Sequence, residues 1–203
     1  MSTEKEKMLR GELYDPTDKE LADRRALAHK LSTDYNMTYE TDEEKRKAIL
    51  DELMPNRGEL SFLQGPIQLD YGCFITVGKH FYANFNFTVL DTCPVTIGDD
   101  VYCGPNVTFA TPVHPFDPNE RRMRFKENGT PYDLEYGKPI TVGNDCWIAS
   151  NVTICGGVTI GDGCVIGAGS VVTRDIPPYS LAAGNPCRVI RKIDVKEERH
   201  EGL

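Results

Sequence analysis

Residues 140–173 read ITVGNDCWIASNVTICGGVTIGDGCVIGAGSVVT, and within this stretch a β-branched aliphatic residue recurs at every sixth position. The six positions are Val142, Ile148, Ile154, Ile160, Ile166 and Val172. A second small or apolar residue stands two positions before each of them. A period of six is typical of hexapeptide-repeat parallel β-helices, in which each repeat supplies one short strand and a turn. The rival interpretation, a single alternating strand of a β-sandwich, does not fit, because such strands are usually only about 3–10 residues long.

The same period continues upstream in two shifted phases. Its positions there are Val77, Ala83 and Val89, and then Ile97, Cys103 and Phe109. A polar, proline-rich stretch, roughly 111–139, then interrupts the repeat. Long loops in compact domains are usually functional or disordered. From the repeats and this interruption we predict a mainly β protein, with a parallel β-helix over 57–183, one long ejected loop at about 111–139, and a tail over 184–203.

Residues 1–56 differ in kind, because they are acidic, rich in Lys and Arg and almost free of glycine. Three capping-box patterns pair Thr3 with Glu6, Thr17 with Glu20 and Thr41 with Glu44. We predict two or three helices that pack against one end or side of the β-helix. Such helices would cover strand edges that are otherwise open. The alternative is that Tyr14 and Asp15 also reach a substrate pocket.

Composition excludes several classes of function. A formal net charge of −8 over 203 residues argues against a general nucleic-acid-binding protein, because phosphate binding needs a basic excess. No apolar run approaches the roughly 18 residues that span a bilayer, and the charged start MSTEKEKMLR has no apolar signal core. We expect a cytoplasmic protein without membrane or nucleic-acid partners.

The seven cysteines contain no C-x-x-C pair. Cys103, Cys146 and Cys164 fall on the apolar register of the repeat, where free Cys behaves as a small hydrophobic residue. We expect reduced thiols that pack in the core.

His114 is the strongest candidate for catalysis. It lies at the root of the ejected loop, in the sequence TPVHPFDP, where flanking prolines restrict the backbone. A near-neutral pKa is typical of histidine and suits a general base that takes a proton from a hydroxyl. The alternative is a loop histidine that merely packs. A zinc site would need more ligands, and His80 is the only plausible companion, since His29 and His200 lie in the flanking segments.

Two further sets of polar residues leave alternatives open. Asn84 and Asp91 lie near a phase shift of the repeat, where they either line a cleft and bind ligand or lie fully hydrogen-bonded in the wall. A basic cluster follows the repeats, and it suits either a phosphate-bearing ligand or a solvated tail. Its members are Arg174, Arg188, Arg191 and Lys192.

At this point the chain resembles a known family, the galactoside and maltose O-acetyltransferases. The resemblance extends over roughly residues 3–193. It rests on EKEKMLRGELYDP at 4–16, DYG at 70–72, FYANFNFTVLDTCPVTIGDD at 81–100, TPVHP at 111–115 and the repeat region from Trp147 to Ile193. The resemblance implies a left-handed β-helix, and acetyl transfer from acetyl-CoA to a sugar hydroxyl of the maltose, glucose or galactoside type. It also implies a homotrimer with sites between neighbouring subunits, and no metal requirement.

The resemblance assigns roles residue by residue. It implies that His114 is the general base, that Asn84 and the backbone N–H of Ser150 stabilise the oxyanion, and that Glu135 orients the histidine, with Glu127 as the fallback. For the sugar it implies contacts from Asp15, Asp70, Tyr82, Asn84 and Asp91. For acetyl-CoA it implies a groove formed by Trp147, Ser150, Ala168, Thr173, Arg174, Arg188 and Arg191.

The chain departs from the family pattern mainly in the loop. The segment between His114 and Pro139 is longer than in typical members and contains the basic run RRMRFK. Pro112 and Val113 stand where relatives often have a T-A-T-H run. These changes bear on acceptor choice and on the role of Glu135. The rival functions are therefore a hexapeptide acetyltransferase for another acceptor (an amino sugar, an antibiotic or a nucleotide sugar) and a non-catalytic β-helix binding protein.

Overall fold

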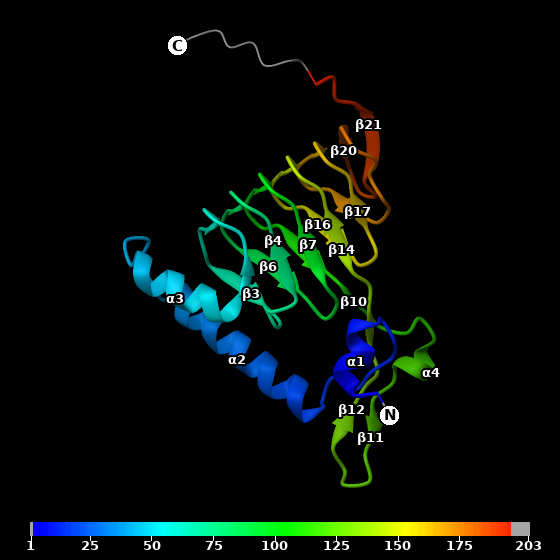
Figure 1. The fold of residues 1–203 in the computed structure, drawn as a ribbon. Coiled ribbons are helices and arrows are strands. Elements are labelled where there is room, and N and C mark those ends of the chain that lie inside the picture. Colours follow the sequence, from blue (N-terminus) through cyan, green and yellow to red (C-terminus); the bar gives the residue numbers. More distant parts are fainter. Residues whose placement is uncertain (1, 196–203) are drawn as a thin grey trace.

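The main body of the protein, seen in a computed structural model that describes residues 2–195, is a parallel β-helix with three sheets (Figure 1). The chain visits the three sheets in turn, and strands of successive turns pair in parallel. The first sheet contains β1 (Asn56–Arg57), β4 (Ile75–Val77), β7 (Val95–Ile97), β14 (Ile140–Val142) and β17 (Thr159–Ile160). The third contains β3 (Ile67–Leu69), β6 (Phe87–Leu90), β9 (Thr108–Ala110), β16 (Thr153–Cys155) and β19 (Val171–Val172).

The second sheet is the longest of the three. It contains β2 (Phe62–Leu63), β5 (Tyr82–Ala83), β8 (Tyr102–Cys103), β15 (Trp147–Ile148), β18 (Val165–Ile166), β20 (Ser180–Ala183) and β21 (Arg188–Lys192). The last strand, β21, pairs antiparallel with β20. Part of the predicted tail therefore folds back as an edge strand and closes the C-terminal end of the sheet.

The core confirms the six-residue period. Every repeat position named above, from Val77 to Val172, is at most 3% exposed. Removing such a side chain from water contributes on the order of 1.5–3 kcal/mol each. The predicted fold class, a left-handed parallel β-helix with a helical N-terminal segment and one long ejected loop, is confirmed.

The corners between the sheets also follow a residue pattern. Asn86, Asn106 and Asn151 occupy one corner in successive turns with φ near +60°, a conformation that asparagine tolerates better than most residues. Their side chains form a ladder, in which Asn86 Nδ2 donates to Asn106 Oδ1 at 2.8 Å and Asn106 Nδ2 donates to Asn151 Oδ1 at 3.0 Å. His80 is a corner residue of the same kind (φ 56°), and its Nδ1 lies 2.9 Å from Asp100 Oδ1.

Three helices precede the β-helix: α1 (Glu4–Leu9), α2 (Lys19–Asn36) and α3 (Glu43–Leu53). In Figure 1, α2 and α3 lie across its N-terminal end, as predicted. Asn36 takes the place of a missing strand there, because its Oδ1 accepts from Ile67 N at 2.7 Å and its Nδ2 donates to Ile67 O at 2.8 Å. The backbone N–H and C=O of Ile67, at the open end of the first turn, are thereby hydrogen-bonded.

Only one of the three predicted capping boxes forms, at Thr3. The other two helices begin one residue later than expected, with Asp18 and Asp42 as N-caps. Asp18 accepts from Glu20 N, whereas the Thr17 hydroxyl donates to Asp15 instead. Since Asp is at least as good an N-cap as Thr, the Asp18 carboxylate replaces the threonine at α2, whereas the Asp42 side chain makes no capping hydrogen bond at α3.

Candidate active site

The ejected loop has a structure of its own. Its ends pair as antiparallel strands β10 (Pro112–Val113) and β13 (Tyr136–Gly137). Between them lie the short helix α4 (Pro118–Arg121) and a hairpin of β11 (Arg124–Phe125) and β12 (Pro131–Tyr132). His114 follows β10 directly, so the paired base of the loop fixes its position.

Two carboxylates flank the His114 ring. Asp133 Oδ2 lies 3.6 Å from Nδ1, and Glu135 Oε2 lies 3.9 Å from Nε2. The histidine side chain is 48% exposed, whereas the Glu135 side chain is 15% exposed. A histidine beside carboxylates can take up a proton and have the resulting charge stabilised, as a general base requires.

Asp133 was not among the residues predicted from the sequence. The signal was present, because side chains two residues apart in extended chain lie on one side, and Asp133 and Glu135 have that spacing on the approach to β13. Glu127, the fallback for Glu135, lies exposed in the turn of the hairpin.

Glu135 is held by the N-terminal segment. Tyr14 N donates to Glu135 O at 3.0 Å and Glu135 N donates to Tyr14 O at 3.3 Å. The Tyr14 hydroxyl donates to Glu135 Oε1. Burial raises the pKa of Glu135 above its ordinary value, while the Tyr14 hydrogen bond and His114 oppose that shift.

Asp15 faces the hairpin. Its Oδ2 lies 2.6 Å from Lys126 Nζ, and its Oδ1 accepts from the backbone and hydroxyl of Thr17 at 2.8 Å and 2.6 Å. Although burial raises the pKa of Asp15, its hydrogen bonds with Lys126 and Thr17 hold that pKa below the ordinary value.

The other residues predicted to bind sugar lie on or beside the β-helix. Asp70 Oδ1 is 3.6 Å from His29 Nε2, and burial raises the pKa of Asp70. Tyr82 projects from the second sheet and stacks on Phe62, with ring centroids 6.0 Å apart. Asn84 is half-buried, and its Oδ1 accepts from Phe85 N at 2.7 Å.

Asp91 departs from the expected sugar contact. It is fully buried, and its two carboxylate oxygens accept from Tyr71 N at 2.8 Å and Phe74 N at 3.3 Å. Of the two alternatives that the sequence left open, Asp91 takes the hydrogen-bonded place in the wall.

Within one chain, Asn84 and His114 occupy different corners of the β-helix. Asn84 lies between β5 and β6, at the corner of the second and third sheets, together with Ser150 and Ala168. His114 leaves from the corner of the third and first sheets, after β9. The third sheet separates them, and three or four extended residues span roughly 10–13 Å.

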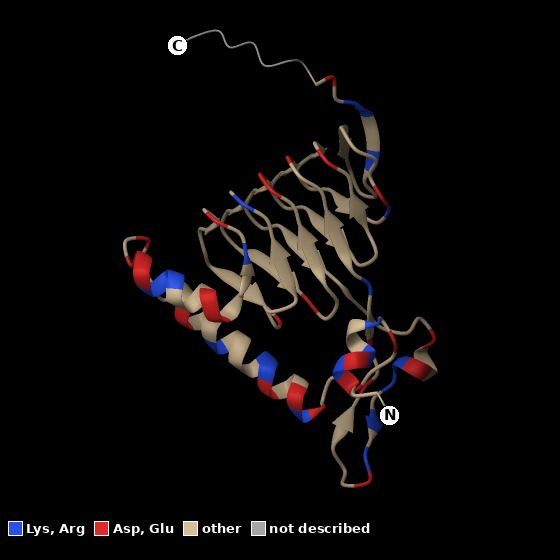
Figure 2. Cartoon of the chain, viewed as in Figure 1, with Lys and Arg blue, Asp and Glu red and all other residues tan. Residues whose placement is uncertain are grey.

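The residues predicted to bind acetyl-CoA lie toward the C-terminal half. Trp147 projects outward from β15 with 55% exposure. Small residues line the nearby corner, whereas the arginines are exposed, with Arg188 and Arg191 on β21 (Figure 2). Thr173 and Arg174 follow β19 at the corner that also carries the loop. Small residues let an extended ligand approach the backbone and arginines suit phosphates, so the chemistry of these side chains fits acetyl-CoA.

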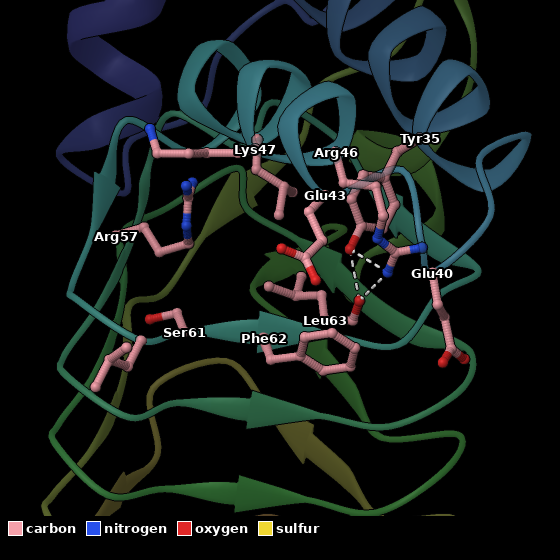
Figure 3. A pocket seen from close by; sticks show the side chains of 11 residues that line it. Tyr35, Glu40, Glu43, Arg46, Lys47, Arg57, Ser61, Phe62 and Leu63 are labelled. Atoms are coloured by element: carbon pink, nitrogen blue, oxygen red, sulfur yellow. Dashed lines mark hydrogen bonds between the residues drawn. The ribbon is translucent and has the colours of Figure 1, made fainter.

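A cavity of about 430 Å³ lies elsewhere, between α3 and the first turn of the β-helix (Figure 3). Arg46 forms part of its wall, donating to the Tyr35 hydroxyl and to Leu63 O at 2.6 Å each. None of the predicted site residues lines this cavity.

Residues 2–195 contain no cluster of three or more His, Cys, Asp or Glu side chains arranged to hold a metal ion. His200 lies outside the described residues. No helix in that same range is long and apolar enough to cross a membrane.

All seven cysteines are free thiols, and burial raises the pKa of Cys146 to about 12.

Two family models match the chain. The model described as bacterial transferase hexapeptide (six repeats) matches residues 139–174, and the maltose acetyltransferase hexapeptide capping motif matches residues 7–58. Together with the fold, these matches define the protein as a hexapeptide-repeat transferase.

Relatives that match nearly the whole chain identify the family within this class. The galactoside O-acetyltransferase of Escherichia coli (strain K12) is 41% identical over 195 residues, which are 96% of this chain and 92% of that protein. A crystal structure of a maltose O-acetyltransferase from Clostridium difficile 630 is 45% identical, with a TM-score of 0.88 over 96% of this chain and 99% of that one. A galactoside acetyltransferase in complex with coenzyme A is 41% identical, with a TM-score of 0.87 over 96% and 92% of the two chains. This chain therefore belongs to the maltose and galactoside O-acetyltransferase family, and it is an acetyltransferase.

Proposed function

We propose that the protein transfers the acetyl group of acetyl-CoA to a hydroxyl of a sugar of the maltose, glucose or galactoside type, with His114 as the general base. The observation that carries this proposal is the exposed His114 ring between Asp133 and Glu135, at the base of the loop. The coenzyme A complex of the related galactoside acetyltransferase supports the choice of donor.

The reaction proceeds by direct attack. An unprotonated ring nitrogen of His114 takes the proton of the acceptor hydroxyl as its oxygen forms a bond to the thioester carbonyl carbon. Asn84 and the Ser150 N–H stabilise the negative charge that develops on the carbonyl oxygen. The C–S bond then breaks, and the thiolate of coenzyme A receives the proton from His114. The products are an acetyl ester and the free thiol, and the histidine is neutral again.

We further propose a homotrimer in which neighbouring subunits share each site. The corners that carry Asn84 and His114 support this arrangement, because one subunit alone holds them apart by the width of a sheet. A neighbouring subunit that presents its own Asn84 corner to the His114 loop completes the site.

The test is the release of thiol from acetyl-CoA with wild type and His114→Ala, against maltose, glucose, galactosides and amino sugars. We expect acceptor-dependent release that falls by about 10²–10⁴-fold in the variant, while acetyl-CoA binding persists. A variant that retains more than about a tenth of the wild-type rate would exclude His114 as the base. Release with amino sugars but not with neutral sugars would favour the rival acceptor class.

A further inference from the structure

The contact between Tyr14 and Glu135 joins the N-terminal segment to the candidate base. Tyr14 is fully buried, in a small apolar cluster with Met8, Leu21 and Tyr71. Its backbone and its hydroxyl together make three hydrogen bonds to a residue 121 positions away. Because the two backbone hydrogen bonds fix the distance between these two segments of the chain, the Tyr14 hydroxyl has little freedom relative to the Glu135 carboxylate.

In the hydrogen bond between Tyr14 and Glu135, Tyr14 is always the donor. Burial and the nearby Glu135 carboxylate raise the pKa of Tyr14, so its phenol stays protonated and donates. This bond occupies Oε1 of Glu135 and leaves Oε2 toward His114 Nε2 at 3.9 Å. A buried carboxylate with one oxygen held can orient an imidazole, whereas a rotating one cannot.

The N-terminal segment is seated closely enough to impose this geometry. A side chain at Gly11 (φ +70°) would place its Cβ 2.8 Å from Gly137 O, so the segment runs in direct backbone contact with β13. Cys93 Sγ also donates to Met8 O at 3.2 Å, which ties α1 to the wall of the β-helix. Figure 1 shows α1 beside the loop and next to the start of α2, away from α3.

We propose that Tyr14 is a positioning residue for catalysis, which acts on His114 through Glu135. This inference rests on the proposed role of His114 as the base. The N-terminal segment then does more than cover the β-helix, because it supplies the hydroxyl that fixes the orienting carboxylate. Tyr14 touches no reacting atom.

Tyr14→Phe keeps the ring and removes only the hydroxyl. We expect kcat to fall by about tenfold, since a hydrogen bond to a charged group is lost, with the KM for acetyl-CoA unchanged. Tyr71→Phe is the matched control, because Tyr71 is buried in the same cluster but its hydroxyl accepts from Arg25 Nη1 at 3.1 Å. Equal kcat values for Tyr14→Phe and Tyr71→Phe would overturn the inference.

The pH profile separates positioning from packing. The groups that face Glu135 are the Tyr14 hydroxyl, His114, Asp133 and Asp70, and the Tyr71 hydroxyl is also near enough to interact with its charge. The Tyr14 bond favours the ionised carboxylate, so its removal raises the pKa of Glu135, and the acid limb of the kcat/KM profile should move to higher pH. A purely structural defect would lower the profile without moving this limb.

A double-mutant cycle with Glu135→Gln completes the test. If Tyr14 acts through Glu135, adding Tyr14→Phe to Glu135→Gln should change kcat by less than twofold. Any folding defect of Tyr14→Phe is present in both backgrounds and cancels. If the effects of Tyr14→Phe and Glu135→Gln on kcat are independent while His114→Ala is inactive, the inference about Tyr14 is overturned. If His114→Ala is active, the proposed function is rejected instead.

Discussion

Asp91 illustrates how surroundings decide the role of a single carboxylate. The sequence places it among polar residues of the kind that bind sugars, yet the structure gives both of its oxygens to backbone N–H groups. Burial, opposed by these bonds, raises the pKa of Asp91 to about 6. Asp91 therefore joins the corner between β6 and β7 to the corner between β3 and β4 in the preceding turn.

This burial predicts a pH dependence of stability. Folded Asp91 holds its proton up to about pH 6, whereas an unfolded aspartate releases it near about pH 3.9. Between these values the folded state binds more protons, so the free energy of unfolding falls as pH rises. Asp91→Asn cannot ionise, and its stability relative to wild type should improve by up to about 3 kcal/mol between about pH 4 and pH 7.

Urea unfolding of both proteins at several pH values and one protein concentration measures this difference. Asp99→Asn is the control, because Asp99 is exposed and accepts a single backbone bond from Lys79 N at 2.7 Å. Parallel stability curves for wild type and Asp91→Asn would show that Asp91 is not the titrating group.

Among the elements, the β11–β12 hairpin is the part of the ejected loop that carries the end of the basic run RRMRFK. Lys126 anchors it to Asp15 and lies 5.6 Å from the Tyr132 ring centroid. The rest of the hairpin is largely exposed, including Phe125 and Pro131. Its position near His114 therefore depends on few contacts.

Lys126→Met should loosen the hairpin while the β-helix stays intact. A partly exposed ion pair is worth up to about 1 kcal/mol, which corresponds to a roughly fivefold rise in the open population. Limited trypsin digestion should then cleave at Arg121, Arg122 or Arg124 about that much faster. Lys5→Met, which removes the ion pair of Lys5 with Glu20, is the control and should leave cleavage in the hairpin unchanged.

The difference between the repeating β-helix and the irregular loop explains how much of the structure could be predicted from the sequence. The period of six determined the inward positions because each turn repeats the same packing, as Val142 and Ile160 show by pairing in adjacent strands. The loop has no such repeat, so its strands β10 and β13 and the place of Asp133 depend on long-range contacts with Tyr14 and Asp15. Likewise, β21 could not be foreseen, since its five exposed residues lack an alternating pattern.

At the scale of the whole molecule, a site shared between subunits makes a quantitative prediction. His114→Ala and Asn84→Ala should each be inactive as pure proteins. In the proposed trimer each site would draw one residue from each of two chains, so about a quarter of the sites in hybrid trimers would be intact after random mixing in equal amounts. Unfolding and refolding the two variants together should therefore restore about a quarter of wild-type activity.

The matched control refolds each variant alone and then combines them, which should give no recovery. Sedimentation of the refolded protein should give three times the 22.7 kDa of one chain. Co-refolded variants that stay inactive as trimers would place both residues of a site in one subunit.

The base of the ejected loop has a consequence for how this protein can change over evolutionary time. Lys138 N donates to Thr111 O at 3.0 Å, and β7 pairs with β14 across the excursion, so the wall continues as if the loop were absent. Because the entropy of closing a loop grows slowly with its length, insertions and deletions here leave the scaffold almost unaffected. A lineage can therefore lengthen, shorten or replace the outer part of this segment, from α4 to β12, while His114, Asp133, Glu135 and the core are inherited unchanged.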